Sequence, residues 1–399
     1  MLNGQKRLSP KKLLTGLLTA FLSLLTVGAA VVPHTTERNS ATAVPPVQTN
    51  LPWQTCWTFP NENLEGSMVA SDNEIVVLPF RDGRLIALDS RTGLPIWSID
   101  LGGRIKSIPD LLGNGIFIVS AVGTGEKNPG RHIIRCLSRQ TGIVIWQEEM
   151  PAAKTESDAR FYLYRFRREL FIAVSGGDFF SFDAFDGHLT GTKNFRSALS
   201  AVPFFKDGRA VLGLSDKRIL TLSLDESEGI VELKTRAVPT AVLTAGDNLV
   251  WGSFRGEVFS AGNAPNKNKD VWRLRTGGEI LTVASDGAAL LAASLDNYIY
   301  SVSVQSGKII WKKRLSGRPA SLNLADGGSA VLVSVGDPSA IIAETKSGRT
   351  INKISFGENI FLDGSPQFSS TFIIFPTSAG LFAVTFGGTC QPTNSIQKK

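Results

Sequence analysis

Hydrophobic and polar residues alternate along this chain in short runs, and turn-forming residues bound each run. The segment from Asp82 to Trp97 shows the pattern most fully. An Asp-Gly turn opens it, a strand of period two follows, and a Thr-Gly turn leads to a second strand with one tryptophan. Similar segments run over residues 132–146 and 296–311, each with a glycine four residues before a tryptophan. A unit that recurs about every 40–50 residues predicts a propeller, a solenoid or another repeat array.

The body of the chain divides into seven units of four expected strands, followed by an eighth that is incomplete. The strands expected in the first unit are Met68–Ala70, Ile75–Phe80, Leu85–Leu88 and Ile96–Ile99. The second unit is expected to begin with Ile108–Leu112, and the third with Phe161–Phe166. The eighth unit offers only Phe361–Phe368, Thr371–Phe375 and Leu381–Phe386.

The missing fourth strand of the last unit has a counterpart at the start of the body. Trp57-Thr58-Phe59 matches Trp97-Ser98-Ile99, the fourth strand of the first unit. An N-terminal strand that completes the last blade would leave no unpaired sheet edge. The sequence therefore predicts an all-β fold, an eight-bladed propeller of four-stranded antiparallel blades closed by this strand.

The cysteines bear on this closure. When the units are aligned on their turn glycines, Cys390 falls at the position of Pro95, and Cys56 falls at the position of Ile96. Closure of the ring would bring these two cysteines to one hairpin, where a disulfide can form in an exported protein. The alternative is two unrelated free thiols. Cys136 takes the position that the small residue Ala87 has in the first unit, and it is interpreted as a buried, unreactive core thiol.

The N-terminus carries an export signal. Four cations, Lys6, Arg7, Lys11 and Lys12, precede an apolar run from Leu13 to Val32. Residues 1–32 are therefore predicted to be a signal peptide or a signal anchor, and the sequence leaves cleavage and retention equally open. Only a retained segment would contact the membrane. In both cases the body is expected in the periplasm or elsewhere in the cell envelope.

The segments outside the propeller have a composition of their own. Residues 33–52 are rich in Thr, Ser, Asn, Ala and Pro and are predicted to be a flexible tether, followed by the propeller at 53–390 and a tail at 391–399. Four of the seven net positive charges lie in the N-terminal segment, so the body is only weakly basic. This charge does not indicate a nucleic-acid partner. The propeller is expected to be monomeric.

Few residues suggest catalysis. The chain has three histidines, which lie in the tether, at the start of a strand and after a turn. Neither a catalytic triad nor a multi-histidine metal site can be assembled from them. Aspartates recur singly at turns without the spacing of a calcium loop, so they are interpreted as turn formers. We therefore expect no cofactor and no catalytic or metal site.

The repeated unit resembles the PQQ-like repeat, G-x-L-x-A-L-D-x-x-T-G-x-x-x-W, and residues 83–97 match it nearly throughout. This repeat forms the blades of quinoprotein dehydrogenases and of the BamB family of outer-membrane assembly lipoproteins. The resemblance implies that tryptophans on the outer strands dock neighbouring blades: Trp57, Trp97, Trp146, Trp272 and Trp311. The aligned positions of units three, four and seven hold Gly191, Leu233 and Asn352.

One stretch is a candidate for partner binding. Cations and aromatics alternate from Arg160 to Arg168, on the expected first strand of blade three near the central channel. The residues proposed to face a partner are Arg160, Tyr162, Tyr164, Arg165 and Arg167. Such interleaving can bind acidic or extended partners. The alternative is that the aromatics pack between blades and the arginines pair with nearby acids.

The leading hypothesis is an exported, non-catalytic propeller that binds a protein or peptide partner as a scaffold at the cell envelope, similar to BamB. The alternatives are a quinone-dependent or other propeller enzyme and a propeller that binds a small ligand. Quinoprotein dehydrogenases typically carry adjacent cysteines and an acidic calcium site. This chain has no adjacent cysteines and no acidic cluster that maps onto that site. The repeat itself specifies the blade and not the function.

Overall fold

The computed structural model describes residues 52–60, 63–123, 130–151, 159–225, 227–262, 270–325, 330–335, 339–369, 372–387 and 390. The predicted export segment, the tether up to Leu51 and the C-terminal tail lie outside these ranges. Within the described residues, no helix is both long and apolar enough to cross a membrane.

The described residues form eight antiparallel sheets that follow one another along the chain. After the short 3-10 helix η1 (Gly66–Met68), the first blade contains β2 (Ala70–Ser71), β3 (Ile75–Pro79), β4 (Arg84–Asp89) and β5 (Pro95–Asp100). The second contains β6 (Arg104–Ile105), β7 (Asp110–Leu112), β8 (Gly115–Val122), β9 (Arg131–Ser138) and β10 (Val144–Glu149). The third contains β11 (Phe161–Phe166), β12 (Glu169–Val174), β13 (Asp178–Asp183) and β14 (Leu189–Asn194). The fourth contains β15 (Phe204–Lys206), β16 (Arg209–Gly213), β17 (Arg218–Ser223) and β18 (Val231–Lys234).

The remaining blades repeat this order. The fifth contains β19 (Pro239–Ala245), β20 (Asn248–Ser253), β21 (Glu257–Gly262) and β22 (Asp270–Arg275). The sixth contains β23 (Ile280–Ser285), β24 (Ala289–Ser294), β25 (Tyr298–Ser303) and β26 (Ile309–Arg314). The seventh contains β27 (Pro319–Ala325), β28 (Ala330–Val335), β29 (Ser339–Glu344) and β30 (Thr350–Ser355). The eighth contains β31 (Gln367–Phe368), β32 (Ile373–Thr377), β33 (Gly380–Phe386) and, from the start of the body, β1 (Trp53–Pro60).

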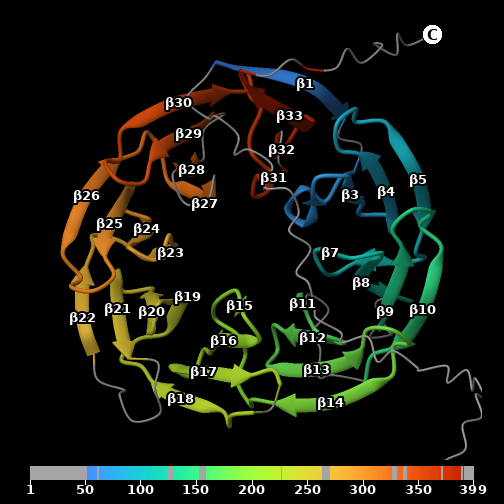
Figure 1. Ribbon diagram of the computed structural model, residues 1–399, viewed down its shortest axis with the longest axis horizontal. Coiled ribbons are helices and arrows are strands. Elements are labelled where there is room, and N and C mark those ends of the chain that lie inside the picture. Colours follow the sequence, from blue (N-terminus) through green and yellow to red (C-terminus); the bar gives the residue numbers. More distant parts are fainter. Residues whose placement is uncertain are drawn as a thin grey trace, which may run out of the picture. The chain divides into compact units, whose positions relative to one another are not determined.

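The sheets are arranged as blades around a central opening, with the first strand of each blade innermost (Figure 1). Strand β1 pairs with β33 in the last blade, and Trp57 lies opposite Ala383. These findings confirm the predicted eight-bladed propeller and its closure by an N-terminal strand. A disulfide joins Cys56 to Cys390, residues 334 positions apart in sequence with their Cα atoms 5.2 Å apart. Cys136 is a buried free thiol.

Hydrophobic contacts between neighbouring blades form the core. The middle strands are almost fully buried because each of them is covered on both faces by another blade; Val76, Val77 and Leu78 of β3 are examples. One cluster joins Phe117 of blade two to Leu170 of blade three, and equivalent clusters join other pairs of blades. Burial on this scale is the main stabilising term of the fold, because each apolar side chain removed from water contributes about 1.5–3 kcal/mol.

The innermost strands differ most from the sequence-based expectation. The strand expected at Met68–Ala70 is replaced by η1 and the two-residue β2. The first strand of blade two is interrupted at Ile108-Pro109, so β6 and β7 pair separately with β8. In blade eight only Gln367–Phe368 of the expected Phe361–Phe368 is a strand. Pro109 and Pro366 lie at the two interruptions, and a proline has no N–H with which to continue a ladder.

Five outer-strand tryptophans make the same contact with the next blade. The indole Nε1 donates to the backbone carbonyl three residues before the turn glycine of that blade: Trp57 to Ser90 (3.0 Å), Trp97 to Arg139 (2.9 Å), Trp146 to Ala184 (3.2 Å), Trp272 to Val304 (2.7 Å) and Trp311 to Thr345 (2.8 Å). Each indole also lies against that glycine, where an added Cβ would come within about 2.7 Å of the ring: Gly93, Gly142, Gly187, Gly307 and Gly348. The five glycines have positive φ, so no other residue fits easily there.

Candidate partner-binding site

The basic and aromatic stretch lies on and beside β11, the innermost strand of blade three. Side chains alternate along this strand, so its odd-numbered and even-numbered residues face different neighbours. Phe161 and Leu163 pack in the core between blades two and three. Tyr162 and Tyr164 pack on the other side, against blade four. The strand is therefore held between two blades.

Most of the residues proposed for partner binding make contacts within the propeller. The ring of Tyr164 stacks on Phe205 with centroids 4.9 Å apart. The Arg165 guanidinium donates to the Leu112 carbonyl at 3.2 Å. Arg167 lies 3.9 Å from the Asp225 carboxylate. These contacts are those of the alternative interpretation, in which the aromatics pack and the arginines pair. Partner binding by Tyr164, Arg165 and Arg167 stays a prediction.

Arg160 and Tyr162 also line a cavity on the inner side of the ring, which we call the inner cavity. Its volume is about 350 Å³, and four consecutive blades contribute to it. Its lining comes from four segments: Ser67 and Met68, Lys106 to Asp110, Arg160 to Leu163, and Val202, Pro203 and Phe205. Burial raises the pKa of the Tyr162 hydroxyl, and the nearby Arg160 opposes this shift. The sequence pointed to the segment from blade three alone.

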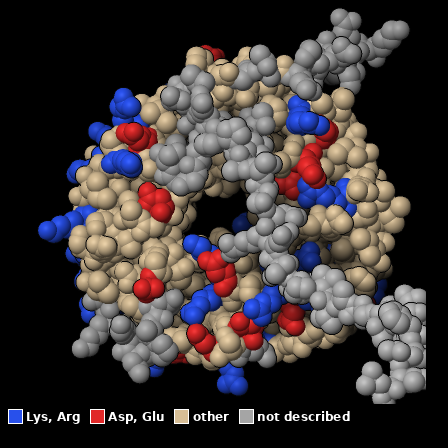
Figure 2. Space-filling view, viewed as in Figure 1, with Lys and Arg blue, Asp and Glu red and all other residues tan. Residues whose placement is uncertain are grey.

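The inner cavity presents apolar side chains to solvent. Ile108 is 49% exposed and Val202 is 65% exposed. Figure 2 shows the opening of the ring on one face, with charged side chains of both signs gathered beside it over the blades that contain β11 and β15. Exposed apolar groups rimmed by charge are typical of a surface that another molecule covers. This arrangement is suited to binding another molecule.

Asp110 is the one carboxylic acid among the described residues that line the inner cavity. Its Oδ2 atom is buried and has no hydrogen-bond partner among the described residues. Burial raises the pKa of the Asp110 carboxyl to about 6, although the positive charge of Arg165 opposes the shift. Burial and the charge of Lys106 lower the pKa of the nearby His132. The cavity therefore holds a carboxyl whose charge changes in the mildly acidic range.

We expect Asp110→Asn to stabilise the protein at neutral pH. The folded-state pKa is above the unfolded value of 3.8, so ionisation of Asp110 lowers the free energy of unfolding as pH rises from about 4 to about 6. A pKa shift of about two units corresponds to a loss of at most about 3 kcal/mol in the free energy of unfolding. Denaturant unfolding of both proteins from pH 3.5 to 7.5 should show the gain above pH 6 and none below pH 4. A gain independent of pH would contradict this assignment.

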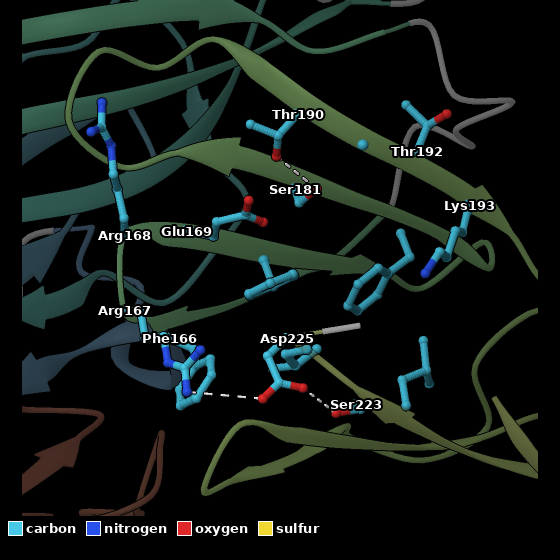
Figure 3. A pocket seen from close by; sticks show the side chains of 15 residues that line it. Phe166, Arg167, Arg168, Glu169, Ser181, Thr190, Thr192, Lys193, Ser223 and Asp225 are labelled. Atoms are coloured by element: carbon cyan, nitrogen blue, oxygen red, sulfur yellow. Dashed lines mark hydrogen bonds and ion pairs between the residues drawn. The ribbon is translucent and has the colours of Figure 1, made fainter. Parts of the chain in front are cut away.

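A second cavity lies between blades three and four, away from the central opening, and we call it the seam cavity (Figure 3). Its volume is about 390 Å³. Figure 3 shows Thr190 and Ser181 on neighbouring strands at one side and Asp225 and Ser223 at the other. Gly191, which occupies the position of a docking tryptophan, is part of its lining. No sequence-based expectation pointed to this cavity.

One group of side chains has the composition of a metal site. The ligand atoms of Asp183, Asp186 and His188 lie within 4.8 Å of one another. Asp183 accepts from the backbone N–H groups of Phe185 and Asp186 and pairs with Arg168. The Nδ1 atom of His188 lies 2.6 Å from the Asp186 carboxylate. Turn formation and ion pairing account for this cluster, and we assign no metal to it.

Comparison with known proteins identifies the family. A family model described as "Outer membrane protein assembly factor BamB" matches residues 42–128, 130–268 and 255–353. The structure is similar to the computationally designed Ika8 protein, with a TM-score of 0.68, 14% identity and coverage of 84% of this chain and 99% of the other. It is also similar to BamB from Moraxella catarrhalis, with a TM-score of 0.61, 14% identity and coverage of 86% and 100%. No curated protein matches the sequence. The family match spans most of the chain, and the chain therefore belongs to the family of the outer-membrane assembly factor BamB.

Proposed function

We propose that this protein is an exported, non-catalytic propeller that binds a protein or peptide partner and acts as a scaffold at the cell envelope. The observation that carries the proposal is the inner cavity, where the exposed side chains of Ile108 and Val202 form an apolar surface on a rigid ring. Membership of the BamB family supports binding to other proteins. The Cys56–Cys390 disulfide supports an oxidising, extracytoplasmic location.

A small ligand is the second candidate occupant of the inner cavity. Its volume of about 350 Å³ falls in the range of about 300–1,000 Å³ that is usual for ligand sites. The Arg160 side chain at its edge could bind an anionic group of such a ligand. A side chain of a peptide partner would use the same surface. A peptide partner and a small ligand are therefore distinguished by identifying the molecule that is bound in the cavity.

We expect site-specific photo-crosslinking to capture a partner at the inner cavity in intact cells. A benzophenone amino acid would replace Val202, which is exposed and lines the cavity. The matched control replaces Ile143, which is also 65% exposed but lies on the turn before the outer strand β10. An envelope protein should be joined to the Val202 variant and not to the Ile143 variant, as measured by immunoblotting and mass spectrometry.

Two results would contradict the scaffold proposal. One is the absence of any adduct at Val202 when the variant is folded and exported. The other is the same set of adducts at Val202 and Ile143, which would indicate contact without a specific site. Recovery of a small molecule from the native protein, in place of a protein adduct, would favour the second candidate.

A further inference from the structure

The seams between blades follow a rule that involves two residues of each blade. The docking tryptophan on the fourth strand lies opposite a small residue on the third strand. The five pairs are Trp57 with Ala383, Trp97 with Ala87, Trp146 with Cys136, Trp272 with Ser260 and Trp311 with Ser301. The small residue leaves room for the indole, which then reaches the next blade. An indole thus fills the space above a small residue at each of these five seams.

The remaining blades depart from this rule in two ways. Blades four and seven lack the tryptophan and place bulkier residues in the equivalent pair: Thr221 opposite Val231, and Ile342 opposite Asn352. The register therefore places Val231, and not Leu233, at the tryptophan position of blade four. Blade three alone among the described blades places two small residues opposite each other, Ser181 and Gly191. The seam cavity lies directly at this pair. It occupies the place that an indole fills at five other seams.

The next blade supplies the acceptor and the apolar walls that receive an indole, whereas Ser227 stands at the position of the turn glycine. In blades one, two, three, six and seven the acceptor of the indole N–H is the carbonyl of the residue that follows the third strand. In blade four the equivalent residue is Leu224, whose N–H bonds to Gly208 as the N–H of Ala184 bonds to Arg168. Leu224 lines the seam cavity, and the buried rings of Phe171 and Phe179 also line it. These groups offer an acceptor position and apolar walls to an aromatic ring.

We assign the occupant to another molecule. Among the residues that the structure does not describe, the only aromatic one is Phe21, within the apolar N-terminal run. The edge of the seam cavity carries charges of both signs, including Arg167, Arg168, Glu169, Lys193 and Asp225. A polypeptide is suited to such an edge because its backbone and flanking side chains can pair with both signs.

We propose that the seam cavity binds a tryptophan side chain of a protein or peptide partner, and that this side chain takes the place of the docking tryptophan that blade three lacks. The proposal rests on the proposed function, since it specifies how the partner of that scaffold is recognised. Aromatic side chains that enter a preformed apolar pocket often dominate a protein interface. The seam cavity is preformed by the fold itself.

The test uses 5-fluoroindole as the probe and full-length protein in detergent, with binding followed by fluorine NMR of the probe. Gly191→Trp would fill the cavity from within, and Ser181→Ile would fill it as Ile342 fills the equivalent place in blade seven. Gly176→Trp is the matched control, because a Cβ at Gly176 meets no atom within 4 Å. The wild type and the control should bind the probe alike, and both filling variants should bind at least about tenfold more weakly.

Equal binding by the wild type and the two filling variants would overturn the proposal, provided that circular dichroism shows all of them folded. So would the absence of saturable binding to the wild type. The partner is tested by placing Gly191→Trp in the protein with the photo-crosslinker at Val202. Loss of probe binding with an unchanged partner adduct would contradict this inference alone. Probe binding by a wild type that yields no adduct would contradict the proposed function alone.

Discussion

Replacing both Cys56 and Cys390 by serine is expected to lower the free energy of unfolding by as much as about 5–6 kcal/mol. The disulfide closes a loop of 334 residues, and loop closure of that length removes a large conformational entropy from the unfolded chain. The native state keeps its ladder between β1 and β33, so the variant should still fold. Guanidinium unfolding followed by circular dichroism, with the wild type in the presence and absence of reductant, measures the difference.

Cys136→Ser is the matched control for this experiment. Cys136 lies opposite Trp146, and serine already occupies the equivalent position opposite Trp272 and Trp311. This substitution removes a thiol without touching the ring closure, so it should change the free energy of unfolding by about 1 kcal/mol or less. The disulfide would have no stabilising role if the double variant and the control unfolded at the same guanidinium concentration.

Local pattern was sufficient to predict the blades because each depends on residues close in sequence. Period-two alternation buries one face of a strand, and a glycine with positive φ, such as Gly93, fixes the turn that follows. The closure of the ring could be predicted by counting expected strands, because the last unit had only three and one further strand preceded the first unit. Where a proline interrupts the pattern, as at Pro109, the alternation of apolar residues continues but the ladder does not.

The cavities could not be predicted in the same way. The inner cavity combines segments around Met68, Ile108, Tyr162 and Val202, and only the curvature of the ring brings these four together. The seam cavity depends on one cross-strand pair, Ser181 with Gly191, and such pairs follow from register, which sequence patterns specify only within one or two residues. The aligned units already showed that Gly191 replaces a tryptophan. That a cavity results could be inferred only once the residue opposite, Ser181, was known.

The contacts of the basic and aromatic strand could not be predicted from the sequence either. The composition of Arg160 to Arg168 indicated binding, and the sequence placed the strand next to the central channel. Which side chains face the channel and which face another blade depends on the neighbours of β11. Tyr164 meets Phe205, and Arg165 meets the Leu112 carbonyl. Both partners lie about 40–50 residues away in sequence, in other blades, where local patterns carry no information about contacts.

Trp272→Ala is expected to lower the free energy of unfolding by about 3–5 kcal/mol, the usual range for removing a large buried aromatic side chain. Trp272 is 8% exposed, its Nε1 donates to the Val304 carbonyl at 2.7 Å, and its indole lies against Gly307 of the next blade. Val271→Ala on the same strand is the control, because Val271 is 52% exposed and should cost about 0.5 kcal/mol or less. Equal losses in the two variants would refute blade docking by Trp272.

A double-mutant cycle with Gly307 separates docking from simple burial. A Cβ at Gly307 would come within 2.6 Å of the Trp272 ring, and its φ of 68° disfavours any side chain. Gly307→Ala should therefore cost more than about 1 kcal/mol in the wild type, from both the clash and the backbone strain. In the Trp272→Ala protein the clash is gone and only the strain remains, so the same substitution should cost less. Strictly additive losses, measured by denaturant unfolding of all four proteins, would mean that the indole and the turn glycine do not hold the two blades together.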